Sequence, residues 1–138
     1  MPLRQLHRLV GVAAVIVFLG TGAYMHFRYD HLRGMSDATR LLFRSTHVYL
    51  LFTGLLNIAL GLGLDRAPGR WGRWLQGTGS ALVLAGPLLA LAAFLREPFL
   101  GGLQRPFTFP AVAASLLGMI LHLIGSEASP VTGSNGRS

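Results

Sequence analysis

The chain has 138 residues, of which 51% are hydrophobic and only 12% are charged, about half the charged share that is usual for soluble domains. Its formal net charge of +7 comes from twelve arginines against five acidic residues, and it has no cysteine, which excludes disulfides, thiol catalysis and thiolate metal sites. The arginines flank long uncharged stretches, where they can contact lipid phosphates. The basic charge therefore does not predict a nucleic-acid partner.

Four stretches lack Asp, Glu and Arg altogether: residues 9–27, 45–64, 74–95 and 106–126. A helix rising about 1.5 Å per residue needs roughly 20 residues to cross a hydrocarbon core about 30 Å thick. We therefore predict an all-α fold, an integral membrane four-helix up-down bundle with a long first helical hairpin. The bundle is expected at residues 1–125, with spans at about 8–27, 44–64, 75–95 and 107–125. The Ser-, Gly- and Pro-rich residues 126–138 are expected to be disordered.

The first span also has features of a signal peptide. A basic N-terminus precedes it, and Thr21-Gly22-Ala23 resembles a cleavage site. The helical apolar pattern continues beyond that site through Phe27. We therefore expect a retained first helix rather than a cleaved one.

The first connection predicts a tight αα-hairpin. Gly34 is typical of the position just past a helix, and Ser36 and Asp37 suit the start of the next one. The first helix is therefore expected to run to about Arg33 and the second to begin at about Asp37. Two antiparallel helices joined by so short a turn would carry the hairpin tip out of the membrane.

The hairpin tip is rich in charged side chains. Counted outward from the turn, Asp30 lies opposite Arg40 and His26 lies opposite Arg44, so we predict that Asp30 and Arg40 interact. The whole charged set is expected to form ion pairs or to contact anionic lipid headgroups or a partner. This set is Asp30, Arg33, Asp37, Arg40 and Arg44.

Helix-breaking residues predict where the other two connections lie. A polar loop is expected from Asp65 to Trp74, with Trp71 and Trp74 in an interfacial aromatic belt. Glu97-Pro98 is expected to end the third helix. Within that helix, Gly86-Pro87 predicts a kink and a carbonyl that loses its helical partner.

Histidines share helix faces with small residues, which has two explanations. Small residues let membrane helices pack closely, with the histidines bonded to lipid or backbone; this is the reading we expect, and it needs no cofactor. Alternatively, paired histidines hold b-type haem. The candidate haem pairs are His26 with His47 and His7 with His122. In the simplest up-down bundle, both pairs belong to adjacent helices, which pack about 8–10 Å apart and leave little room for haem.

A metal site is a further alternative at the hairpin. His26 and Asp30 are i,i+4 neighbours, and His31 and His47 are expected nearby. The surrounding arginines would repel a cation, so an anionic ligand is the better expectation here.

The second helix carries a polar stripe made of Thr46, Tyr49, Thr53 and Asn57. An amide exposed to lipid would leave its hydrogen bonds unmade, so Asn57 is expected to face another helix. The carbonyl freed by Pro87 is the expected partner. We expect this stripe to hold helices together rather than to line a pore.

The sequence predicts a setting more clearly than an activity. It contains no recognisable catalytic motif, and no carboxylate lies deep in a span, which argues against proton-coupled antiport. We expect a small polytopic protein of the cell membrane that serves as a structural, accessory or partner-binding subunit, with a haem-binding redox subunit as the alternative. The expected partners are the bilayer and a larger membrane complex or a second copy. Six arginines fall on each side of the membrane, and the basic N-terminus favours cytoplasmic termini.

Overall fold

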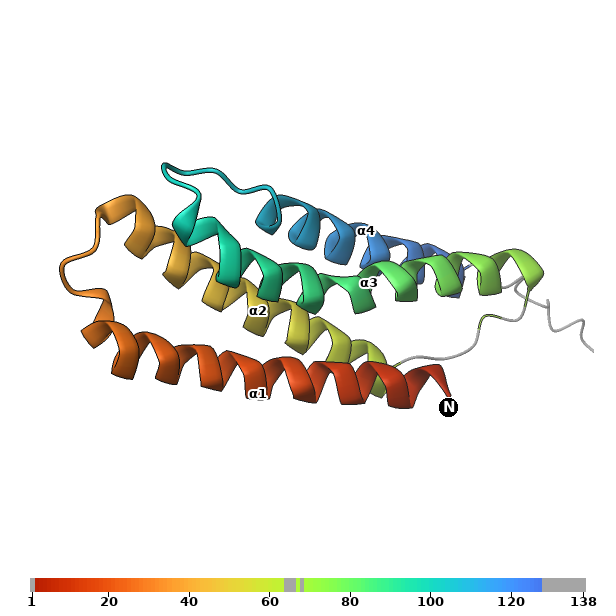
Figure 1. The fold of residues 1–138 in the computed structure, drawn as a ribbon. Coiled ribbons are helices and arrows are strands. Elements are labelled where there is room, and N and C mark those ends of the chain that lie inside the picture. The colour runs from red at the N-terminus through yellow and green to blue at the C-terminus, as the bar shows by residue number, and fades with distance from the viewer. Residues whose placement is uncertain (1, 64–66, 68, 128–138) are drawn as a thin grey trace, which may run out of the picture.

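The computed structural model describes residues 2–63, 67 and 69–127, and all the regular structure among them is helical. The four long helices are α1 (Leu3–Tyr29), α2 (Asp37–Gly63), α3 (Arg70–Arg96) and α4 (Thr108–Glu127), and two 3-10 turns, η1 (Asp30–Leu32) and η2 (Glu97–Phe99), follow α1 and α3. The helices lie beside one another and alternate in direction (Figure 1). This confirms the all-helical class with four helices. Ser126 and Glu127, which were expected to begin the disordered tail, are instead the last residues of α4, and the rest of the predicted tail lies outside the described residues.

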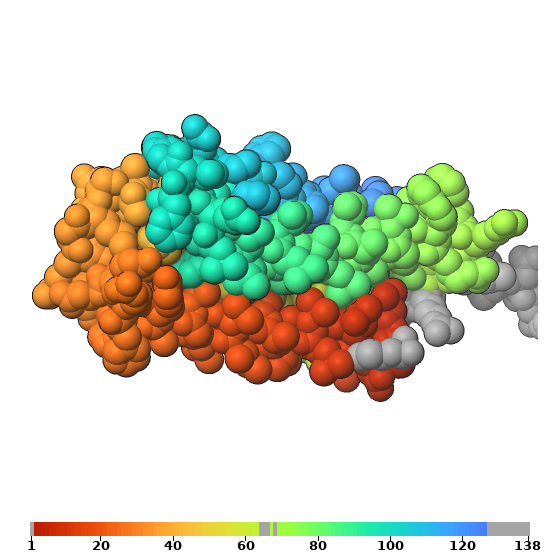
Figure 2. Space-filling model, in the orientation of Figure 1, coloured from red at the N-terminus to blue at the C-terminus, as the bar shows by residue number. Residues whose placement is uncertain are grey.

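The helices pack as two pairs. α1 lies against α2 and α3 against α4, and contacts of α2 with both α3 and α4 join the pairs. On the face drawn in Figure 2, α1 and α3 border one another, but their backbones make few contacts. The backbones of α1 and α4 make almost no contact. The simple square, in which the first helix neighbours the fourth, is therefore not the arrangement found.

Small residues allow the helices of each pair to touch through their backbones. A methyl group on Gly11 would lie 2.8 Å from the Gly54 carbonyl oxygen, and one on Gly79 would lie 2.6 Å from the Gly118 carbonyl oxygen. Both distances are shorter than a carbon–oxygen van der Waals contact. The small-residue faces are thus occupied by direct helix–helix packing.

This packing predicts opposite effects at two glycines of α3. Gly79→Ala is expected to lower the free energy of unfolding by about 1–3 kcal/mol, because the new methyl group must push α4 away. Gly77 has nothing within 4 Å of an added methyl group, so Gly77→Ala is expected to raise it by up to about 1 kcal/mol through better helix propensity. Denaturant titration in mixed micelles measures both. Equal effects would show that α3 and α4 do not meet at Gly79.

The hairpin departs from the expected register. α1 ends at Tyr29 instead of about Arg33, whereas α2 begins at Asp37 as predicted. The three residues of η1 have left-handed φ values of 42°, 57° and 66°, which non-glycine residues adopt at an energetic cost. Leu32 is only 2% exposed and packs against Phe43, and this burial helps to hold the strained turn.

The predicted ion pair between Asp30 and Arg40 is not formed. Asp30 pairs with Arg33 at 3.6 Å, and Arg40 pairs with Asp37. The early end of α1 moves Asp30 out of the expected register, and each charge finds a partner three residues away in its own segment. These pairs are largely exposed, so each contributes little to stability.

The second connection is shorter than expected. α3 begins at Arg70, so Trp71 and Trp74 belong to its first turns rather than to a loop. Their rings stack with centroids 5.5 Å apart and remain 67% and 60% exposed. At the opposite end of the helix, Glu97-Pro98 ends α3 as predicted.

Candidate functional site

Polar side chains gather inside the bundle, while large apolar side chains cover its outside. Ile16, Leu88 and Phe109, for example, are 63%, 71% and 75% exposed. The buried polar and charged residues come from all four helices and from η2. They are His7, Thr21, Thr46, Thr53, Asn57, Gln76, Ser80, Glu97, Thr108, Ser115 and His122.

Asn57 links three helices at the centre of this polar interior. Its Nδ2 donates to the Thr53 carbonyl at 2.9 Å and to the Val83 carbonyl of α3 at 3.0 Å. Pro87 has no N–H to offer the Val83 carbonyl four residues before it, so this is the contact expected from the sequence. Because both Nδ2 hydrogens are used, the 2.8 Å contact between His7 Nδ1 and Asn57 Oδ1 has His7 as its donor.

His7 is therefore held with its proton on Nδ1. The side chain is 0% exposed, and Nε2 is the one fully buried side-chain nitrogen or oxygen without a hydrogen-bond partner in the described part of the chain. The rings of His7 and of His122 in α4 form a T-shaped pair, with centroids 6.1 Å apart and planes at 75°. Two of the predicted histidines are thus brought together across the two helix pairs.

His122 also contacts Ser80 of α3. Ser80 Oγ lies 2.7 Å from His122 Nε2, a distance also found between a nucleophile and its base. However, Ser80 is 1% exposed and does not line the neighbouring cavity of about 300 Å³, whose walls include His122, Gln76 and Met119. A substrate would not reach the hydroxyl, so we interpret this contact as a hydrogen bond that links α3 to α4.

His47 takes a different partner. Its Nδ1 lies 2.9 Å from Thr21 Oγ1, and that hydroxyl donates to the Phe18 carbonyl. His47 Nδ1–H is therefore the donor to Thr21. The ring also stacks on Phe18 at 4.1 Å, beside Gly22. His47 thus fastens α2 to α1.

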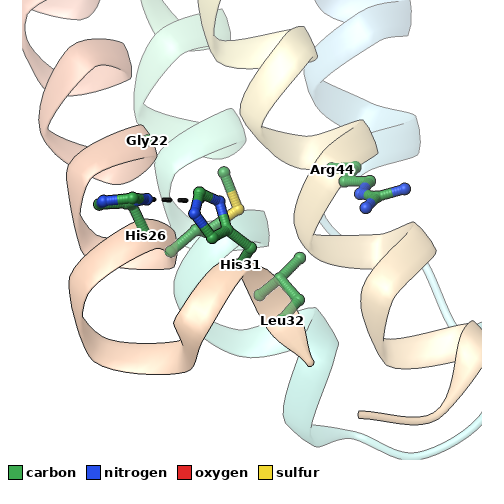
Figure 3. A pocket seen from close by; sticks show the side chains of 6 residues that line it. Gly22, His26, His31, Leu32 and Arg44 are labelled. Carbon is green, nitrogen blue, oxygen red and sulfur yellow. Dashed lines mark hydrogen bonds between the residues drawn. The ribbon is translucent and has the colours of Figure 1, made fainter. Parts of the chain in front are cut away.

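His26 pairs with His31 near the hairpin tip. Their Nδ1 atoms are 3.3 Å apart, because the left-handed turn at η1 folds His31 back toward α1. The two rings border a cavity of about 170 Å³ that Arg44 also lines. Figure 3 shows the Arg44 guanidinium directed away from the imidazoles.

The five histidines fall into three separate contacts, which bears on the haem and metal alternatives. His7 and His122 come together, whereas His26 bonds to His31 and His47 to Thr21. No three His, Cys, Asp or Glu side chains gather around one point within the described ranges. The four residues of the alternative metal site at the hairpin, His26, Asp30, His31 and His47, therefore do not converge on one point.

The remaining predicted site residues divide by burial. Thr46 and Thr53 are 0% exposed, and their hydroxyls donate to carbonyls of their own helix, while Tyr49 is half-buried. At the tip, Arg33, Asp37 and Asp30 stay at the surface, as described for the ion pairs.

Glu97 is a buried residue that sequence reasoning missed. Its side chain is 0% exposed, and Oε1 accepts the N–H groups of Phe107 and Thr108 at 2.8 and 2.7 Å, while Oε2 accepts the Thr108 hydroxyl. A carboxylate at a helix N-terminus satisfies free N–H groups and favours the helix dipole. Glu97 thus caps α4 from the end of α3.

The signals for the missed residues are faint. The only hint for Glu97 is an acidic residue placed next to a helix-ending proline, eleven residues before the next helix begins. Thr21 lies two turns from the buried Ala14 on the same face of α1, which is typical of a helix interface. Hydroxyl groups in apolar helices gave no indication of their partners.

Comparison with known proteins adds no family. No protein-family model matches the chain, and no curated protein or solved structure matches it significantly.

Proposed function

We propose that the chain is an integral membrane protein that crosses the bilayer four times and acts as a structural or partner-binding membrane subunit. The observation that supports this best is the reversal of polarity between inside and outside. Each helix has an apolar window long enough to span a bilayer, and only 17% to 44% of the residues in these windows are buried. In water, so much exposed apolar surface would aggregate. In a bilayer, lipid tails or partner helices cover it.

The polar interior fits the same proposal. In hydrocarbon, polar side chains are stable only when they bond within the protein. Asn57, His47 and His122 each bond to a neighbouring helix, so the polar residues hold the bundle together. At the ends, Arg8 and Arg4 bond to the carbonyls of Gly61 and Leu62, where guanidinium groups can also contact phosphates of anionic lipids.

Membrane integration predicts resistance to alkaline extraction. The protein, expressed in a bacterial host, is expected to stay in the membrane pellet after washing with carbonate at high pH and to be released by detergent. A peripheral protein of the same net charge is expected in the carbonate supernatant, since only electrostatic attraction holds it. Release of this chain by carbonate would contradict the proposal.

Haem binding stays a separate prediction. The encounter of His7 and His122 is the observation that favours it. A Soret band in the purified protein that is lost in His122→Ala would establish it, and a colourless preparation would reject it.

A further inference from the structure

His7 has a buried ring nitrogen without a hydrogen-bond partner. Because Nδ1–H donates to Asn57 Oδ1, Nε2 carries a lone pair that no donor reaches and that is not exposed. An imidazole that donates from one nitrogen to a carbonyl-type oxygen and presents the other is oriented as metal-ligating histidines are. A buried acceptor without a partner is otherwise costly.

We propose that His7 and His122 form a binding site for one soft monovalent metal ion, copper(I). With metal–nitrogen bonds of about 2.0–2.1 Å, two imidazoles on one ion hold their ring centroids roughly 5–6.5 Å apart. The centroid separation found is 6.1 Å. His122 Nε2 is bonded to Ser80, which orients the ring and leaves Nδ1 for the ion.

The surroundings determine which ion fits. Zinc in proteins is almost always held by four ligands or by three with a water, but no third His, Cys, Asp or Glu joins this pair among the described residues. Copper(I) accepts two or three ligands, and imidazole and thioether are among those it binds. Met119 lines the same cavity as His122 and offers a thioether.

The nearby charges favour an ion of low charge. The hydrogen-bond partners of the two imidazoles, Asn57 and Ser80, are neutral, and the guanidinium groups of Arg4 and Arg8 lie at the same end of the bundle. A dication in a buried neutral site would pay a much larger desolvation cost than a monocation. The cavity of about 300 Å³ brings an ion to His122, which is the member of the pair that lines it.

The test is an anaerobic titration of the full chain in detergent, with copper(I) supplied by a chromophoric chelator. We expect one copper(I) to be transferred per chain, and an affinity at least tenfold weaker in His7→Gln and in His122→Gln. His26→Gln is the matched control, because His26 is a histidine at the opposite end of the bundle, and its affinity is expected to be unchanged. Since the chain has no cysteine, thiolates contribute nothing to the signal.

X-ray absorption of the copper-loaded native chain is independent of any folding defect in the variants. We expect scattering from two imidazoles at a low-coordinate copper(I). Failure to take copper from the chelator, unchanged affinity in both variants, an absence of imidazole scattering or tighter binding of zinc would each overturn the proposal. A Soret band in the isolated protein would do the same in favour of haem. None of these results bears on whether the chain crosses the membrane.

Discussion

Asn57→Leu is expected to lower the free energy of unfolding by about 2–4 kcal/mol. The substitution leaves His7 Nδ1–H and the Val83 carbonyl without partners in an interior that water does not reach, at about 1–3 kcal/mol for each buried group. This exceeds the average of about 0.6 kcal/mol for a membrane-helix hydrogen bond, because Pro87 prevents the Val83 carbonyl from returning to a helical bond. Denaturant titration in mixed micelles measures the loss.

Thr53→Val is the matched control on the same face of α2. The Thr53 hydroxyl donates only to the Leu50 carbonyl of its own helix, so its loss should cost less than about 1 kcal/mol. Equal losses in the two variants would show that Asn57 does not link α2 to α1 and α3.

Glu97→Ala is expected to have the largest effect on stability, about 3–5 kcal/mol. It removes the acceptor of two backbone N–H groups and one hydroxyl at the start of α4, each worth about 1–3 kcal/mol when left unpaired in a buried site. Denaturant titration in mixed micelles measures this loss as well. Local loss of order is expected first at the N-terminus of α4, where hydrogen exchange of the Thr108 amide should accelerate.

Glu97→Gln separates capping from charge. Glutamine keeps one oxygen for both N–H groups and can donate to the Thr108 hydroxyl, so we expect a loss of only about 1 kcal/mol. Asp30→Asn is the surface control, because the Asp30–Arg33 pair is more than 70% exposed, and it should change stability by less than about 0.5 kcal/mol. An effect of Glu97→Ala no larger than that of Asp30→Asn would contradict the capping role.

The parts of the fold that follow from local rules could be predicted. The lengths of the uncharged stretches predicted the four helices, and Asp37 predicted the start of α2. Pro87 predicted a free carbonyl for Asn57. The small-residue faces predicted helix contacts, since small residues permit such close approach. Each of these depends on the residue itself or on its own helix.

The parts of the fold that depend on contacts between helices could not be predicted. The end of α1 at Tyr29 and the left-handed η1 turn rest on burial of Leu32 against α2, which sequence spacing does not report. The pairing of Asp30 with Arg33 followed from that change. His7 with His122 was one of two candidate pairs from the sequence, but which pair makes contact depends on how the helices are offset, and many offsets are compatible with the same helix faces.

In the proposed arrangement, the apolar outer faces of the helices contact lipid while the polar side chains face inward. Nitroxide labels on single cysteines test it most directly, because the native chain has none. Ile16 lies midway along α1 and is 63% exposed, and the Asp37 side chain at the hairpin tip is 93% exposed. In liposomes, the label at position 16 is expected to collide mainly with oxygen and the label at position 37 mainly with a water-soluble nickel chelate. A label at position 16 that is relaxed more by the nickel chelate than by oxygen would contradict the account.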